Sequence, residues 1–124
     1  MVVQSFDVPS SRINDLRELE KKIVDLGRAG KTDEALSLYQ GVDEPTVRLM
    51  NSAIDACSRA KQTRLEQAFE IFEEGVQEYD LTPNVFTFGA LMNACNRDRN
   101  SSRALDLLET MQVSGCFVNI RQYG

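Results

Sequence analysis

The sequence predicts an all-α protein, an α-solenoid of stacked helix–turn–helix repeats. The first observation is that NSAIDAC at 51–57 returns as GALMNAC at 89–95, 38 residues later. The second is that apolar residues follow the period of a helix through almost the whole chain. The third is that turn-forming segments separate the helical stretches at intervals of about 31, 38 and 35 residues. Because one amphipathic hairpin cannot bury both of its faces, a repeat of this length predicts hairpins stacked on one another.

Three pairs of helices are predicted, each with a turn between its members. The pairs lie at 13–26 and 35–39, at 47–59 and 64–80, and at 85–97 and 102–111. The first helices of the second and third pairs share apolar residues at offsets 0, 3, 6, 7 and 10 from Val47 and from Val85. Each set makes one apolar stripe along about three helical turns, as expected of a helix with one buried side.

The predicted boundaries divide the chain into an N-terminal extension, a degenerate first repeat, two further repeats and the start of a fourth. They are 1–11, 12–46, 47–84, 85–119 and 120–124. Thr32, Thr46, Asn84 and Asn119 each precede a predicted helix, and each has a side chain suited to an N-cap. Since IRQYG at the end restarts the pattern, we expect the sequence to be part of a longer protein.

The composition of the chain argues against several classes of site and function. A formal net charge of −5 argues against indiscriminate nucleic-acid binding but permits a local basic stripe. The chain has no histidine, and its three cysteines form no CxxC pair, so we expect no metal, cofactor, disulfide framework or catalytic residue. Cys57 and Cys95 share one repeat position and are predicted to pack in the core. No apolar run approaches the roughly 18–20 residues of a membrane span, and no targeting segment is recognisable in MVVQSFDVPSSR.

The repeated phrases resemble those of one family. VRLMNSAIDACSRA and VFTFGALMNACNRD resemble the first helix of the pentatricopeptide repeat, whose consensus runs like VVTYNTLIDGLCKAG. AGKTDEALSLY, RLEQAFEIFEE and SRALDLLETM resemble its second helix, and LTPN resembles the segment that closes each unit. The resemblance covers about residues 16–124. Tetratricopeptide repeats fit less well, since their Trp or Leu-Gly pair and their Ala-Tyr signature do not appear in the predicted first helices.

The resemblance implies a protein that binds single-stranded RNA in mitochondria or plastids, with the first helices lining a concave face. In the family, the residue after the aromatic of the first helix and the last residue of the unit contact the base. The resemblance therefore implies base contacts from Asn51 paired with Asn84, and from Asn119, whose partner Gly89 has no side chain to offer. Two amides can both donate and accept, and the family pattern favours cytosine for them. Asn84 is equally expected to cap the helix that starts at Val85, and the two roles are compatible.

Other positions depart from the family pattern. In the first repeat the corresponding pair is Glu20 with Thr46, and a carboxylate is unfavourable beside RNA. The position that wedges between bases, a small aliphatic residue in the family, is Arg48, Phe86 and Arg121 here. Phe86 can stack on a base, and Arg48 can stack or contact a phosphate. Both side chains are also compatible with exposure to solvent or contact with a partner protein.

Three arginines, Arg28, Arg59 and Arg97, hold equivalent places near the ends of the first helices. In the family a basic residue here faces the phosphate backbone, and arginine suits phosphate because its planar fork is always charged. The alternative is that each cation stabilises the C-terminal end of its helix, by roughly 0.3–1 kcal/mol. The acidic residues concentrate on the second helices, so most of the negative charge lies away from the predicted concave face.

Three functions remain open at this point. The first is an RNA-binding module of an organellar repeat protein. The second is a scaffold subunit that docks on protein partners in a large organellar assembly, such as a ribosome or a membrane complex. The third is the substrate-positioning part of an enzyme whose catalytic domain lies beyond Gly124, although the chain itself shows no catalytic pattern.

Overall fold

The computed structural model describes residues 2–114, with side chains described for residues 15–112. Within this part the chain forms six α-helices and no strand, which confirms the all-α prediction. The helices are α1 (Val2–Arg28), α2 (Thr32–Gln40), α3 (Val47–Arg59), α4 (Leu65–Gln77), α5 (Val85–Arg97) and α6 (Ser101–Ser114). The bounds of α3 and α5 are those predicted from the apolar period. Asn119, Arg121 and the predicted start of a fourth repeat lie outside the described residues.

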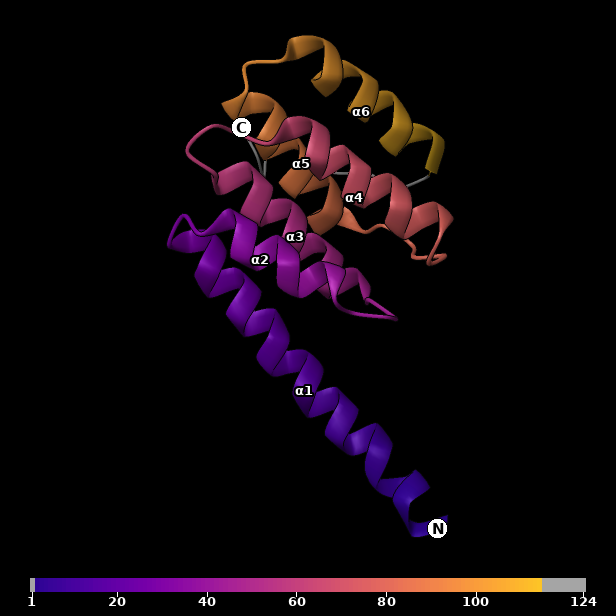
Figure 1. The fold of residues 1–124 in the computed structure, drawn as a ribbon. Coiled ribbons are helices and arrows are strands. Elements are labelled where there is room, and N and C mark those ends of the chain that lie inside the picture. The colour runs from indigo at the N-terminus through magenta and orange to yellow at the C-terminus, as the bar shows by residue number, and fades with distance from the viewer. Residues whose placement is uncertain (1, 115–124) are drawn as a thin grey trace.

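The helices form consecutive hairpins that stack into a solenoid, as the colour gradient of Figure 1 shows. α1 packs on α3 and α3 packs on α5, so the first helices make one continuous inner layer. α2 packs on α1 and α3, α4 packs on α3 and α5, and α6 packs on α5. Each outer helix thus covers the seam between two inner helices wherever the next inner helix is described. Within residues 2–114, no helix is both long enough and apolar enough to cross a bilayer.

The first helix is longer than predicted. α1 begins at Val2, so the predicted extension 1–11 continues into the helix expected from Ile13 onward. Figure 1 shows its first half extending beyond the other helices. The contacts of α1 with the solenoid among the described side chains lie in its second half, where Ile23 is fully buried.

The core lies between the two layers. Met50 of α3 and Phe88 of α5 hold equivalent positions and are both fully buried. The ring of Phe72, on α4, meets the ring of Phe88 edge to face, with centroids 5.8 Å apart. Burial of each such side chain stabilises the fold by about 1.5–3 kcal/mol, which ties neighbouring hairpins together. Cys57 and Cys95 are also fully buried, as predicted.

Two of the predicted N-caps are confirmed. The Thr46 hydroxyl accepts a hydrogen bond from Leu49 N at 3.2 Å at the start of α3. Asn84 starts α5 with a capping box, in which its side chain accepts from Thr87 N while the Thr87 hydroxyl accepts from Asn84 N. Both caps satisfy amide groups that a helix start leaves without partners. Asn119, the fourth predicted cap, lies outside the described residues.

The predicted cap at Thr32 is wrong. The N-cap of α2 is Lys31, and Thr32 is already the first helical residue, buried with a hydroxyl that has no hydrogen-bond partner. The cause is the end of α1, where Gly30 at φ +81° lets Lys31 N bond to Leu26 O and Gly30 N bond to Gly27 O. These two bonds form a Schellman motif, and its last residue, Lys31, is also the N-cap of α2. The cap therefore falls on a lysine, which has no side-chain acceptor.

A glycine permits the close approach of α1 to α3. A Cβ built on Gly27 would lie 3.1 Å from Ala56 Cβ, which is tighter than ordinary packing. Gly27 precedes Arg28 as Ser58 precedes Arg59, so the equivalent place on α3 accepts a side chain. The first pair of inner helices is therefore closer-fitting at this point than the repeat pattern requires.

Candidate nucleic-acid interface

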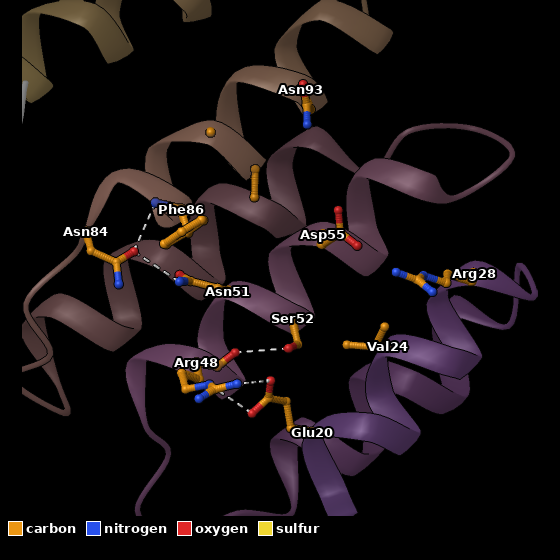
Figure 2. Close-up of a pocket in the computed structure, with 12 residues that line it drawn as sticks. Glu20, Val24, Arg28, Arg48, Asn51, Ser52, Asp55, Asn84, Phe86 and Asn93 are labelled. Carbon is orange, nitrogen blue, oxygen red and sulfur yellow. Dashed lines mark hydrogen bonds and ion pairs between the residues drawn. The ribbon is translucent and has the colours of Figure 1, made fainter. Parts of the chain in front are cut away.

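An open groove of about 640 Å³ crosses the exposed side of the inner helices. Its lining comes from α1, α3 and α5 and from the residue before α5. The lining residues are Glu20, Val24, Arg28, Arg48, Asn51, Ser52, Asp55, Asn84, Phe86, Gly89, Ala90 and Asn93. Figure 2 shows most of them converging from three neighbouring helices. On each helix they recur every three or four residues, which places them on a single face.

Equivalent repeat positions form two rows across the groove. One row is Glu20, Asn51 and Gly89, and the other, one helical turn further along, is Val24, Asp55 and Asn93. The backbone positions repeat, but the side chains differ within each row. The first row has a carboxylate, an amide and then no side chain, and the second has an apolar residue, a carboxylate and an amide. A repeat that fixes position leaves the groove-facing side chain free to differ, because this side chain takes no part in the core.

The sequence-predicted pair Asn51 and Asn84 is brought together between α3 and α5. Asn51 Nδ2 donates to Asn84 Oδ1 at 3.1 Å, and the Thr87 hydroxyl lies 2.6 Å from Asn51 Oδ1. The same Asn84 oxygen also accepts from Phe86 N and Thr87 N, both at 3.1 Å. The side-chain oxygen of Asn84 therefore both caps α5 and accepts the hydrogen bond from Asn51.

Beside this pair, Phe86 projects from the first turn of α5 and is 71% exposed. Gly89 and Ala90, one turn further along α5, also line the groove and add no bulk to it. Exposure of a whole aromatic ring next to polar groups provides a flat apolar surface on which a base or another planar group can stack.

Arg48, the other residue predicted to wedge between bases, lies between α1 and α3 and is engaged in an ion pair. The guanidinium of Arg48 reaches back to α1 and forms a two-pronged ion pair with Glu20, at 3.1 and 3.2 Å. Figure 2 shows the Arg48 side chain directed toward Glu20, with both contacts drawn. The Arg48 side chain is 78% exposed and that of Glu20 25%, so this pair lies at the surface of the groove.

The three arginines predicted to contact phosphate have three different surroundings. Arg28 lines the groove, and no ion pair is formed by it within the described part of the chain. Arg59 donates to Asp55, four residues earlier on α3, at 2.8 Å. Arg97, at the end of α5, is exposed and is not part of the groove lining. The three arginines, predicted to be equivalent from the repeat, thus do not form one continuous row of unpaired cations along the groove.

Sequence reasoning did not predict several lining residues. Asp55 and Asn93 could have been found, because they follow Asn51 and Gly89 by four residues and so share their face. Thr87, which is buried beside the lining and not part of it, could have been found as well, since it stands at the capping-box distance from Asn84. The Glu20–Arg48 pair had no local signal, because its members lie on different helices.

The buried thiols are poor nucleophiles. Burial raises the pKa of Cys57 to about 12, an effect only partly offset by the nearby charge of Arg64. Burial likewise raises the pKa of Cys95 above its usual value. Both cysteines therefore remain neutral at physiological pH. No group of three or more potential metal ligands is found among the residues that the structure describes.

Sequence comparison identifies the repeat. A model described as "pentatricopeptide repeat domain" matches residues 44–97, and one described as "PPR repeat" matches residues 86–116. Together they extend over more than half of the chain. The chain belongs to the pentatricopeptide repeat family. Of the three helices that line the groove, α3 and α5 lie within the matched residues.

Two curated relatives from Arabidopsis thaliana are also named pentatricopeptide repeat-containing proteins. One is 35% identical over 82 residues, which make up 66% of this chain and 13% of the relative. The other, named as mitochondrial, is 26% identical over 99 residues, which make up 76% of this chain and 23% of the relative. The chain thus spans less than a quarter of the length of these relatives.

Proposed function

We propose that this part of a pentatricopeptide repeat protein binds single-stranded RNA along the groove of α1, α3 and α5. A pyrimidine, cytosine by preference, contacts Asn51 and Asn84 while its ring stacks on Phe86. The observation that carries the proposal is the hydrogen-bonded Asn51–Asn84 pair beside an aromatic ring that is 71% exposed. Amide groups match the edge of an unpaired base, and exposed aromatic rings are the usual stacking surface for such bases.

Charge supports the same proposal only in part. Arg28 is the groove arginine without an ion pair among the described residues, and it is the first candidate for a phosphate contact. The acidic residues of the middle repeat lie mainly on α4, which belongs to the outer layer. The carboxylates that do line the groove, Glu20 and Asp55, oppose RNA directly. We therefore expect weak, salt-sensitive binding by this stretch alone, with affinity supplied by further repeats.

The first test compares two exposed apolar side chains by fluorescence anisotropy with a short single-stranded RNA rich in cytosine and uracil. Phe86→Ala is expected to weaken binding roughly fivefold or more, as loss of one stacked base does. Leu105→Ala is the matched control, because Leu105 is 62% exposed but lies on α6, in the outer layer. Equal effects of the two substitutions, or no binding of wild type at low salt, would contradict the proposed interface.

A scaffold role is the second candidate, and the paired charges favour it. Arg48 and Arg59, both predicted to face RNA, are held by Glu20 and Asp55. A groove with internally balanced charge suits a protein surface better than a polyanion. Under this alternative the full-length protein cosediments with an organellar assembly after ribonuclease treatment, whereas an RNA-mediated association is lost.

The proposed location is a mitochondrion or a plastid. It is supported by the family and by the name of one relative, which is described as mitochondrial. The test is imaging of the full-length protein with a fluorescent protein at its C-terminus, beside mitochondrial and plastid markers. A uniform cytosolic signal would contradict the proposal.

A further inference from the structure

We propose that Thr87 is a specificity-determining residue, whose hydroxyl holds the Asn51 amide oxygen so that the amide nitrogens of Asn51 and Asn84 face the RNA base. The inference rests on the proposed function and deepens it. Thr87 is fully buried and does not line the groove, so it acts through the two asparagines and not by touching RNA.

The orientation of Asn84 follows from the start of α5. Two backbone N–H groups, those of Phe86 and Thr87, point at one side-chain atom of Asn84 from 3.1 Å. Only an oxygen can accept both hydrogen bonds, so the amide nitrogen must face the other way. Figure 2 shows the nitrogen of Asn84 directed away from these contacts. No hydrogen bond of this nitrogen is formed with the described residues.

The orientation of Asn51 then follows from that of Asn84. Since the nearest atom of Asn84 is an acceptor, the Asn51 atom 3.1 Å from it must be the nitrogen. This places Asn51 Oδ1 on the side of Thr87. Asn51 retains one amide hydrogen and one lone pair for a ligand.

Thr87 completes the network with its single hydroxyl proton. The hydroxyl oxygen lies 2.6 Å from Asn51 Oδ1 and 3.1 Å from Asn84 Oδ1, so the shorter contact, to Asn51, takes the proton. The same oxygen accepts from Asn84 N at 3.1 Å. Rotation of the Asn51 amide would set its oxygen against Asn84 Oδ1, which is also an acceptor, and it would remove the oxygen that accepts the Thr87 hydroxyl proton.

The locked pair therefore offers mainly donors to a base: both hydrogens of Asn84 Nδ2 and one of Asn51 Nδ2. Cytosine presents two adjacent acceptors, N3 and O2, on its Watson–Crick edge, whereas uracil carries a hydrogen on N3. A donor-rich site thus favours cytosine because uracil would set one N–H against another. Without the Thr87 hydroxyl, the Asn51 amide loses the donor that holds its oxygen, and only the contact with Asn84 Oδ1 still opposes a rotation that would present this oxygen, which suits uracil.

The experiment measures anisotropy with short oligocytidine, oligouridine and oligoadenosine for three variants of the full chain. Thr87→Val keeps the volume and removes the hydroxyl, and it is expected to lower the cytidine-over-uridine preference roughly fivefold or more. Thr87→Ser keeps the hydroxyl and is expected to keep the preference. Thr46→Val is the matched control, since it removes a capping hydroxyl at the start of α3 and leaves the amide network intact. All variants are first checked for helicity by circular dichroism.

NMR of the side-chain amides provides a readout that does not need RNA. In wild type, the Asn51 amide proton that is donated to Asn84 Oδ1 is expected to exchange slowly with water, and this protection is expected to fall in Thr87→Val, because the Asn51 oxygen loses its donor. A Thr87→Val protein that binds every RNA more weakly at an unchanged preference would overturn the proposal, because Thr87 would then serve the fold alone. Fast exchange of both Asn51 protons in wild type would overturn it too. Retained protection in a protein that binds no RNA would instead reject the proposed function, and with it the specificity role.

Discussion

Between α1 and α3 the groove is lined mainly by charged residues, all of which except Arg28 are paired among the described residues, whereas between α3 and α5 it is lined by amides, small residues and one exposed ring. Glu20 holds Arg48 on the first side, while Asn51 and Asn84 bond to each other on the second. Of the described lining residues, those on α5 and Asn84 carry no charge. The two halves share one backbone arrangement, yet only the second offers a pair of amides and a stacking surface, whereas the first offers the guanidinium of Arg28.

The difference teaches which constraints a helical repeat imposes. Met50 and Phe88 occupy equivalent core positions and are both fully buried, because the seam between layers must be filled in every repeat. The groove positions next to them, Asn51 and Gly89, line the groove and differ in chemistry. Chemistry can therefore change from one hairpin to the next at little cost in stability, and a repeat count does not give the number of bases bound.

The largest expected effect comes from breaking the closer-fitting side. Gly27→Leu places a side chain where even a Cβ would lie 3.1 Å from Ala56, and it should separate α1 from α3. We expect the free energy of unfolding to fall by about 1–3 kcal/mol, measured by urea denaturation. Gly41→Ala is the control, because its Cβ would meet only ordinary contacts at 3.6 Å. Similar stabilities for both variants would show that the two helices do not rely on Gly27.

The next effect compares the helix starts on the two sides. Asn84→Ala removes the acceptor for two backbone amides of α5 and for Asn51, and we expect a loss of about 1–2 kcal/mol in unfolding free energy. Thr46→Ala removes one bond, to Leu49 N, and a loss of about 0.5–1 kcal/mol is expected. Urea denaturation of both variants under one set of conditions measures the difference. A larger loss for Thr46→Ala would contradict the expectation that the capping box of Asn84 stabilises its helix start more than the single bond of Thr46 does.

Much of the fold could be predicted because local sequence determines it. The bounds of α3 and α5 follow from apolar residues at helical spacing, and the caps at Thr46 and Asn84 follow from side chains with acceptors just before those stripes. The prediction failed at Thr32 because the Schellman motif at Gly30 moved the helix start to a residue with no acceptor. Turn geometry, and not capping preference, decided that boundary.

The groove could be predicted only where one repeat position implies another. Asn51 and Asn84 were paired through the resemblance to the family, and the structure brings them to 3.1 Å. The ion pairs that occupy Arg48 and Arg59 were not predicted, because position in a repeat does not reveal which neighbour a long side chain reaches. Arginine has enough rotatable bonds to reach a carboxylate on its own helix or on the next.

The smallest expected effect concerns the charged side and tests whether Glu20 withholds Arg48 from RNA. Glu20→Gln should strengthen binding about two- to fivefold, because one repulsive charge is removed and one arginine is released. The plot of log affinity against log salt should steepen by about 0.7, the value for one more phosphate contact on a single strand. Glu18→Gln is the control, since it makes the same change in net charge at an exposed position outside the groove.

The double variant Glu20→Gln, Arg48→Gln separates the two contributions. Arg48→Gln alone should change affinity little, since the guanidinium is engaged by Glu20, which is 25% exposed and lies within 3.2 Å. In the Glu20→Gln background the same substitution should reverse the change in salt dependence. If Glu18→Gln and Glu20→Gln strengthen binding equally, only long-range charge matters and the ion pair has no gating role. If Arg48→Gln alone weakens binding strongly, RNA already displaces Glu20, and the α1–α3 side then belongs to the binding surface as fully as the α3–α5 side.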